Sequence, residues 1–93
     1  MPLFAVTYRY DASQAEAREG NKPAHRQWLS SQVDAGNIRS VGPFTDGSGA
    51  LLLVETADPD AARALVADDP HCLRGLVPEV TVREWSPVFG AFA

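Results

Sequence analysis

The stretch that decides the fold is "NIRSVGPFTDGSGALLLVET", residues 37–56. Residues 37–44 favour a strand, and residues 45–49 carry the Asp-Gly signal of a tight hairpin turn. Residues 50–56 are a run of aliphatic side chains long enough for a return strand. We therefore predict two antiparallel strands joined by a short turn in the middle of the chain.

The chain before this hairpin divides into a strand, a loop and a helix. Residues 3–10 alternate, with their larger apolar side chains on one face, which predicts a strand. Residues 11–21 are polar, so we expect a loop with one helical turn at most. A helix should follow, with Pro23 in its first turn, and end near Ala35, before Gly36.

The chain after the hairpin supplies a second helix and a last strand. Asp58 and the following proline open a short helix that ends near Ala67. After Asp69 and its proline, residues 79–85 alternate again as a strand. The order β-α-β-β-α-β is the ferredoxin-like arrangement of the α+β class, in which two helices pack on one face of an antiparallel sheet.

The strand 50–56 is apolar on both faces, with Leu51 and Leu53 on one side and Leu52 and Val54 on the other. Two helices cover only one face, and monomers rarely expose a large apolar patch. We therefore predict a homodimer whose open sheet faces meet. If Leu52 and Val54 form the contact face, Leu51 and Leu53 belong to the helix-side core. The alternative is that the tail 86–93 folds back over the open face.

Composition narrows the class of protein. The 93 residues are expected to form a single domain, 1–93, with a net charge of −4 and no cluster of Lys and Arg. Nucleic acids and anionic membranes both bind surfaces with clustered positive charge, so neither is an expected partner. One cysteine, Cys72, and the lack of an apolar span indicate a soluble, cytoplasmic protein without an internal disulfide.

His25 is the first candidate for chemistry. At about 100° per residue it shares a helix face with Leu29 and Val33, and Trp28 lies about 60° to the side, so His25 should point toward the sheet. The imidazole is either a satisfied core group or a proton-transfer group in a pocket between helix and sheet. Placed in the first helical turn, it would be favoured as the neutral form that a general base requires.

The stretch "DDPHCLRGL", residues 68–76, holds the other candidates. Asp69 is an N-cap for a turn that starts at Pro70, and an aspartate held in this way can also orient an imidazole. With His25 and His71 it forms a possible two-histidine, one-carboxylate metal set, but the spacing is not diagnostic. We expect no metal and no cofactor. Ser48 either donates to a ligand or simply forms the hairpin turn.

An ordered set of short motifs resembles the YCII-related (YciI-like) family over nearly the whole chain. The motifs are "KPAH" (22–25), a glycine at 36 followed by Gly-Pro at 42–43, Gly-Ser at 47–48, and "ADDP" (67–70). The resemblance implies a ferredoxin-like dimer similar to the dimeric α+β barrel group. It also implies an active-site histidine and aspartate, which fall on His25 and Asp69 by motif position. His71 replaces the aromatic residue that usually follows Asp-Pro in the family.

The resemblance implies a function as well. One type of family member is a dehydrochlorinase of a hydroxylated ring, while most have no assigned reaction. We therefore expect a small cofactor-independent enzyme with His25 as general acid/base and Asp69 fixing its tautomer. Ser48, His71 and Trp28 are the expected substrate-binding residues in a cleft for a small molecule. The alternatives are a non-catalytic dimeric domain that binds a small ligand or a partner protein and, by fold analogy alone, a monooxygenase-like dimer.

Overall fold

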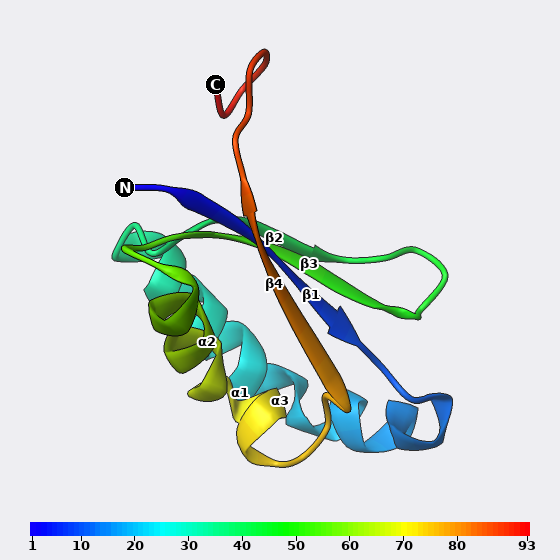
Figure 1. The fold of residues 1–93 in the computed structure, drawn as a ribbon. Coiled ribbons are helices and arrows are strands. Elements are labelled where there is room, and N and C mark those ends of the chain that lie inside the picture. The colour runs from blue at the N-terminus through cyan, green and yellow to red at the C-terminus, as the bar shows by residue number, and fades with distance from the viewer.

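The computed structural model describes residues 1–93 as a four-stranded antiparallel sheet with helices on one face (Figure 1). The elements are β1 (Leu3–Arg9), a 3-10 turn η1 (Ala12–Gln14), α1 (Ala15–Asp34), β2 (Ile38–Pro43), β3 (Gly49–Glu55), α2 (Pro59–Ala67), α3 (Pro70–Leu73) and β4 (Glu79–Trp85). The strand order is β2-β3-β1-β4. The predicted ferredoxin-like α+β fold is confirmed.

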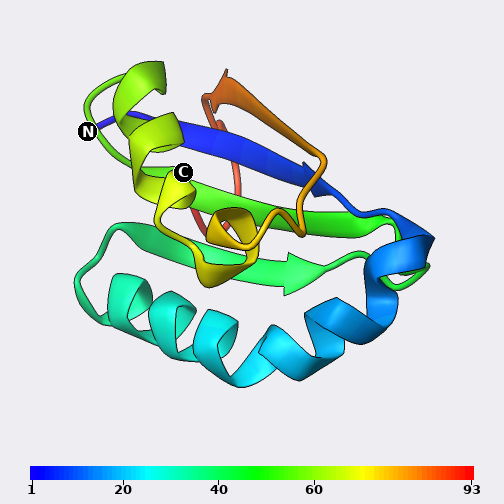
Figure 2. The same ribbon diagram turned by 90° about the horizontal axis from the view of Figure 1, so that it is seen from below.

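The helices form one layer against the sheet. Helix α1 lies beside β2, α2 contacts β1 and β4, and the short α3 sits between the two longer helices (Figure 2). Asp58 caps α2 by accepting a hydrogen bond from the backbone N–H of Ala61 at 2.7 Å, as its Asp-Pro motif predicts. None of the helices combines the length and the apolar character that crossing a membrane requires.

The predicted loop at residues 11–21 is wrong, because most of it belongs to α1. The helix begins at Ala15 and runs for 20 residues, with Pro23 inside it rather than in its first turn. Its first half carries polar side chains toward a pocket instead of an apolar stripe toward the core, so the helical period of apolar residues is missing there. The Ala, Glu and Arg residues of the segment are strong helix formers and were the available signal. The predicted end near Ala35 is confirmed.

The core lies between the sheet and the helices. Its buried members are Phe4, Val6, Tyr8, Ile38, Ala50, Leu52, Val54, Ala62 and Val66. The conditional assignment of the two faces of β3 is therefore reversed: Leu52 and Val54 belong to the helix-side core, and Leu51 and Leu53 point to the open face. Leu53 is only 8% exposed, whereas Leu51 is 36% exposed. When both faces of a strand are apolar, its sequence does not show which face turns toward the helices.

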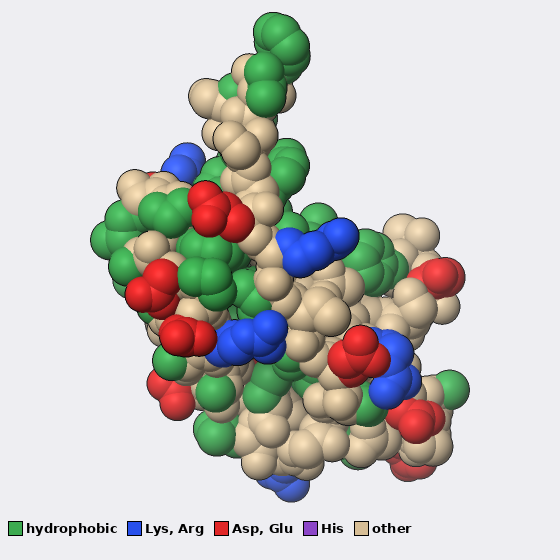
Figure 3. All heavy atoms as spheres, in the orientation of Figure 1, with side chains coloured by type: hydrophobic (Ala, Val, Ile, Leu, Met, Phe, Trp, Pro, Cys, Tyr) green, Lys and Arg blue, Asp and Glu red, His purple; other side chains and the backbone are tan.

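The C-terminal tail does not cover the open face. Residues 86–93 leave the end of β4 and project away from the sheet, and Figure 3 shows them as a protrusion from the body (Figures 1 and 3). Phe89 in this tail is 93% exposed. The open face of the sheet also leaves Leu51 and Trp85 exposed, while an Arg9–Glu79 ion pair lies toward one end of it. Phe92 of the tail meets the Trp85 ring, with centroids 6.4 Å apart, but Leu51 and Trp85 stay exposed, so the tail does not cover this face as the alternative expected.

Candidate active site

His25 and Asp69 meet between α1 and α3. The Nδ1 atom of His25 lies 2.8 Å from Oδ1 of Asp69, and both residues are buried. A carboxylate oxygen only accepts, so Nδ1 of His25 donates, and in the neutral ring Nε2 carries the lone pair. His25 lies ten residues after the start of α1, about 15 Å along the helix. The predicted effect of the helix N-terminus on His25 is therefore wrong, because the field of a helix end fades within the first turn.

Asp69 is held from three directions. Its side chain is fully buried at 0% exposure and caps α3 by accepting from the backbone N–H of His71 at 2.9 Å through Oδ1. Its Oδ2 accepts from the hydroxyl of Tyr8 at 2.8 Å. With the His25 bond, the carboxylate receives three hydrogen bonds, so its position relative to the His25 ring is fixed. The cap and the histidine contact are made by one and the same side chain.

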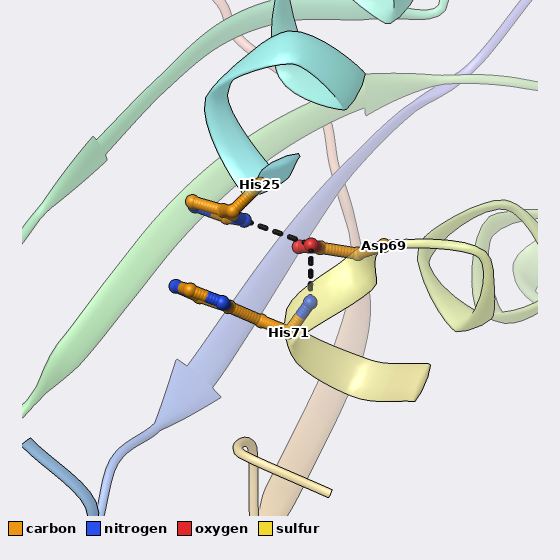
Figure 4. A group of neighbouring side chains, drawn as sticks. All are labelled: His25, Asp69 and His71. Atoms are coloured by element: carbon orange, nitrogen blue, oxygen red, sulfur yellow. Dashed lines mark hydrogen bonds and ion pairs between the residues drawn. The ribbon is translucent and has the colours of Figure 1, made fainter. Parts of the chain in front are cut away.

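His71 is stacked on His25. The two ring centroids lie 3.8 Å apart with an interplanar angle of 3°. Figure 4 shows the rings one above the other, with their far ends pointing to the same side, away from Asp69. The Nδ1 atom of His71 lies 3.0 Å from Nδ2 of Asn21, which is buried in α1. The His71 ring also makes a T-shaped contact with Tyr10, with centroids 6.3 Å apart.

These rings line the main pocket of the structure, a cavity of about 470 Å³ between α1 and the sheet. Its lining residues are Tyr8, Tyr10, Ala15, Arg18, Glu19, Lys22, His25, Arg26, Leu29, Val41, Gly42, Pro43, Gly47, Ala50, Leu52 and His71. One wall is therefore apolar and the α1 wall is charged. Small-ligand sites commonly have this mixture of apolar surface and a few convergent polar groups.

Burial and neighbouring charges shift several groups of the site. Desolvation, with the adjacent His25, lowers the pKa of His71 to about 4. Desolvation and the nearby Asp69 carboxylate raise the pKa of Tyr8 far above its usual value, so its hydroxyl stays a donor. Burial also raises the pKa of the Cys72 thiol to about 11. Cys72 therefore remains a thiol at neutral pH and is no nucleophile.

One nitrogen or oxygen from each of His25, Asp69 and His71 lies within 4.8 Å of the others, the only such arrangement of possible metal ligands in the chain. The fit is poor, because Asp69 already receives three hydrogen bonds and a metal at Oδ1 would displace His25 or the cap. A metal ion binds in the plane of each imidazole ring, along the lone pair of its nitrogen. The lone pairs of two parallel stacked rings do not point at one common position. We assign no chemistry to a metal here.

The other expected site residues lie elsewhere. Trp28 packs against the hydrophobic core, and Ser48 is in the hairpin turn; neither lines the pocket. Two contributors were missed, Tyr8 and Asn21. Tyr8 was predicted only as a strand residue, and its partner Asp69 is 61 residues away in sequence, so no local pattern links them. Asn21 fell within the predicted loop, where its helical relation to His25 at i, i+4 could not be seen.

Comparison with known proteins agrees with this architecture. None of the curated proteins matches the chain. Among solved structures, 5-chloro-2-hydroxyhydroquinone dehydrochlorinase (TftG) from Burkholderia phenoliruptrix AC1100, in complex with 2,5-dihydroxybenzoquinone, is similar in fold. The TM-score is 0.78 at 24% sequence identity, over 90% of this chain and 93% of that chain. The model of the YCII-related domain matches residues 2–86, as the sequence motifs predicted, and the chain therefore belongs to the YCII-related family.

Proposed function

We propose that this chain is a small enzyme that uses His25 as general acid/base on a small hydroxylated aromatic substrate. The observation that carries the proposal is the buried 2.8 Å contact between His25 Nδ1 and Asp69 Oδ1 beside a pocket of about 470 Å³. A base held by a buried carboxylate keeps one tautomer and is stabilised when it takes a proton. The dehydrochlorinase with a similar fold acts on a hydroxylated ring, which supports this substrate class.

The first step would be transfer of a proton from an O–H or C–H group of the substrate to Nε2 of His25. Asp69 would then balance the imidazolium through the hydrogen bond to Nδ1. In an elimination from a chlorinated hydroxylated ring, His25 returns this proton to the ring carbon that bears chlorine. Loss of a proton from a second hydroxyl group then expels chloride and leaves a quinone. In an isomerisation the same proton returns to a different atom of the substrate. Both reactions balance without an oxidant or a reductant.

The test uses 5-chloro-2-hydroxyhydroquinone, the compound named for the similar enzyme. Chloride release and the absorbance of the product would be measured for the purified protein and for His25→Ala. We expect turnover by the native protein and its loss in the variant. If a panel of hydroxylated and chlorinated rings binds but none is converted, the chain is a binding domain and the catalytic proposal fails.

We also propose that the open sheet face pairs with a second copy of the chain. The supporting observation is that apolar side chains of β3 and β4, including Leu51 and Trp85, remain exposed on this face although Phe92 of the tail meets Trp85. In this dimer the exposed Phe89 of the tail packs against the partner. Burial of such a face in a two-fold dimer removes it from water without any further segment of this chain.

A further inference from the structure

His71 and Asn21 are not needed for the proton transfer proposed above, yet both are buried beside it. The amide nitrogen Nδ2 of Asn21 can donate but cannot accept a hydrogen bond. It therefore donates to Nδ1 of His71, 3.0 Å away, and Nδ1 must accept. The pKa of His71, lowered to about 4, keeps the ring neutral near pH 7. A neutral ring whose Nδ1 accepts carries its single proton on Nε2.

The two stacked rings are thus held in opposite tautomers. His25 donates from Nδ1 to Asp69 and keeps a lone pair on Nε2, whereas His71 accepts at Nδ1 and keeps a proton on Nε2. Their far ends point to the same side, and both rings line the pocket (Figure 4). An acceptor and a donor are therefore presented on the same side of the stack, by two parallel rings whose centroids lie 3.8 Å apart.

The charges around the pocket indicate what such a pair would meet. The pocket is lined by three cationic side chains, Arg18, Lys22 and Arg26, and by one acidic side chain, Glu19. Three positive charges and one negative charge leave +2 on the pocket lining, and the Asp69 carboxylate behind His25 reduces the balance of the site to +1, in a chain whose net charge is −4. A local excess of opposite sign to the whole chain favours an anion. The Arg18 guanidinium also lies 4.2 Å from the centre of the Tyr10 ring, which holds it at the pocket.

We propose that His71 binds an anionic substrate by donating from Nε2–H to an oxygen that carries negative charge, and that Asn21 is the positioning residue that keeps the proton on Nε2. The ligand class is an enolate or phenolate, with the oxygen next to the atom that faces His25 Nε2. This deepens the proposed function and rests on it only for the catalytic step. His71 stays neutral while His25 is an imidazolium, because a second positive charge stacked on the first would be unfavourable.

Direct detection of the tautomers is the first test. The chain has two histidines, so ¹⁵N labelling of histidine gives NMR signals from two rings. The signals that disappear in His71→Phe belong to His71. We expect His25 to be protonated on Nδ1 and His71 on Nε2 at neutral pH. In Asn21→Asp the new carboxylate would accept from His71 and move its proton to Nδ1. A native His71 protonated on Nδ1, or no change of tautomer in Asn21→Asp, would overturn the role of Asn21.

Binding of 2,5-dihydroxybenzoquinone, measured by calorimetry, is the second test. A hydrogen bond to a charged group is worth enough that His71→Phe, which keeps the stacked ring, should weaken binding by about 10-fold to 100-fold. Asn21→Asp should weaken it at least as much, while Gln27→Glu, an exposed change of the same kind outside the pocket, should not. Unchanged binding in His71→Phe would refute the proposal. Binding that follows these expectations without turnover would refute the proposed catalysis and leave this inference standing.

Discussion

Replacing Asp69 with asparagine separates the structural role of this side chain from its charge. An amide oxygen in the position of Oδ1 can still accept from the backbone N–H of His71 and from Nδ1 of His25. The amide nitrogen would then face the hydroxyl of Tyr8, which can turn to accept. Asn caps a helix about as well as Asp, so Asp69→Asn should fold. Only the negative charge beside His25 is removed.

The size of the effect follows from the geometry. Hydrogen bonds to charged groups are worth about 1.5 to 3 kcal/mol, and a pair of unit charges about 4 Å apart near a protein surface interacts by about 4 kcal/mol. The imidazolium formed in the reaction would lose about 2 to 4 kcal/mol of stabilisation. This corresponds to a fall in kcat of about 30-fold to 1000-fold, with chloride release as the assay. Binding of the unreacted substrate should change less, because the charge matters most after proton transfer.

The matched control is Asp58→Asn. Asp58 is also an N-cap followed by proline, but it is exposed and lies at the start of α2, outside the pocket. Its variant should keep full activity and nearly full stability. If Asp69→Asn were as active as Asp58→Asn, Asp69 would be a cap and no more, and the charge-based reasoning for the His25 pair would be refuted.

Three further expectations concern stability and assembly. Tyr8→Phe removes the donor to a buried carboxylate oxygen and should lower the free energy of unfolding by about 1 to 3 kcal/mol in urea titrations; an unchanged midpoint would show that the bond contributes nothing. The pKa of His71 is lower in the folded chain, about 4, than the ordinary value of 6.5, so the unfolded state binds more protons in this window and stability should fall as pH drops from 6.5 toward 4. His71→Phe should flatten that part of a pH series of thermal melts, and an equally steep curve would contradict it. Leu51→Asp should give a folded monomer in sedimentation, whereas Leu52→Asp should unfold the chain; a native protein that sediments near 10 kDa would defeat the dimer.

Local sequence patterns predicted most of the sheet, but they failed for the first half of α1, which lines the pocket. The alternation in 3–10 and in 79–85 and the Asp-Gly turn are short-range signals, and they placed β1, β4 and the central hairpin to within one or two residues. The first half of α1 has no apolar stripe, because its polar side chains line the cavity. A method that searches for helices by their buried face therefore reads this segment as a loop.

The amino-acid sequence by itself determined the order of strands and helices, the helix cap at Asp69, and, through its motifs, the family and the pair of His25 and Asp69 as candidates. Only the tertiary structure decided which face of β3 is buried, and only it brought Tyr8, Asn21 and His71 to that pair. The reason is one of range. Turns, caps and alternation depend on neighbours within a few residues, whereas the contacts of Asp69 span 44 and 61 residues and exist only once α1, α3 and β1 have packed together.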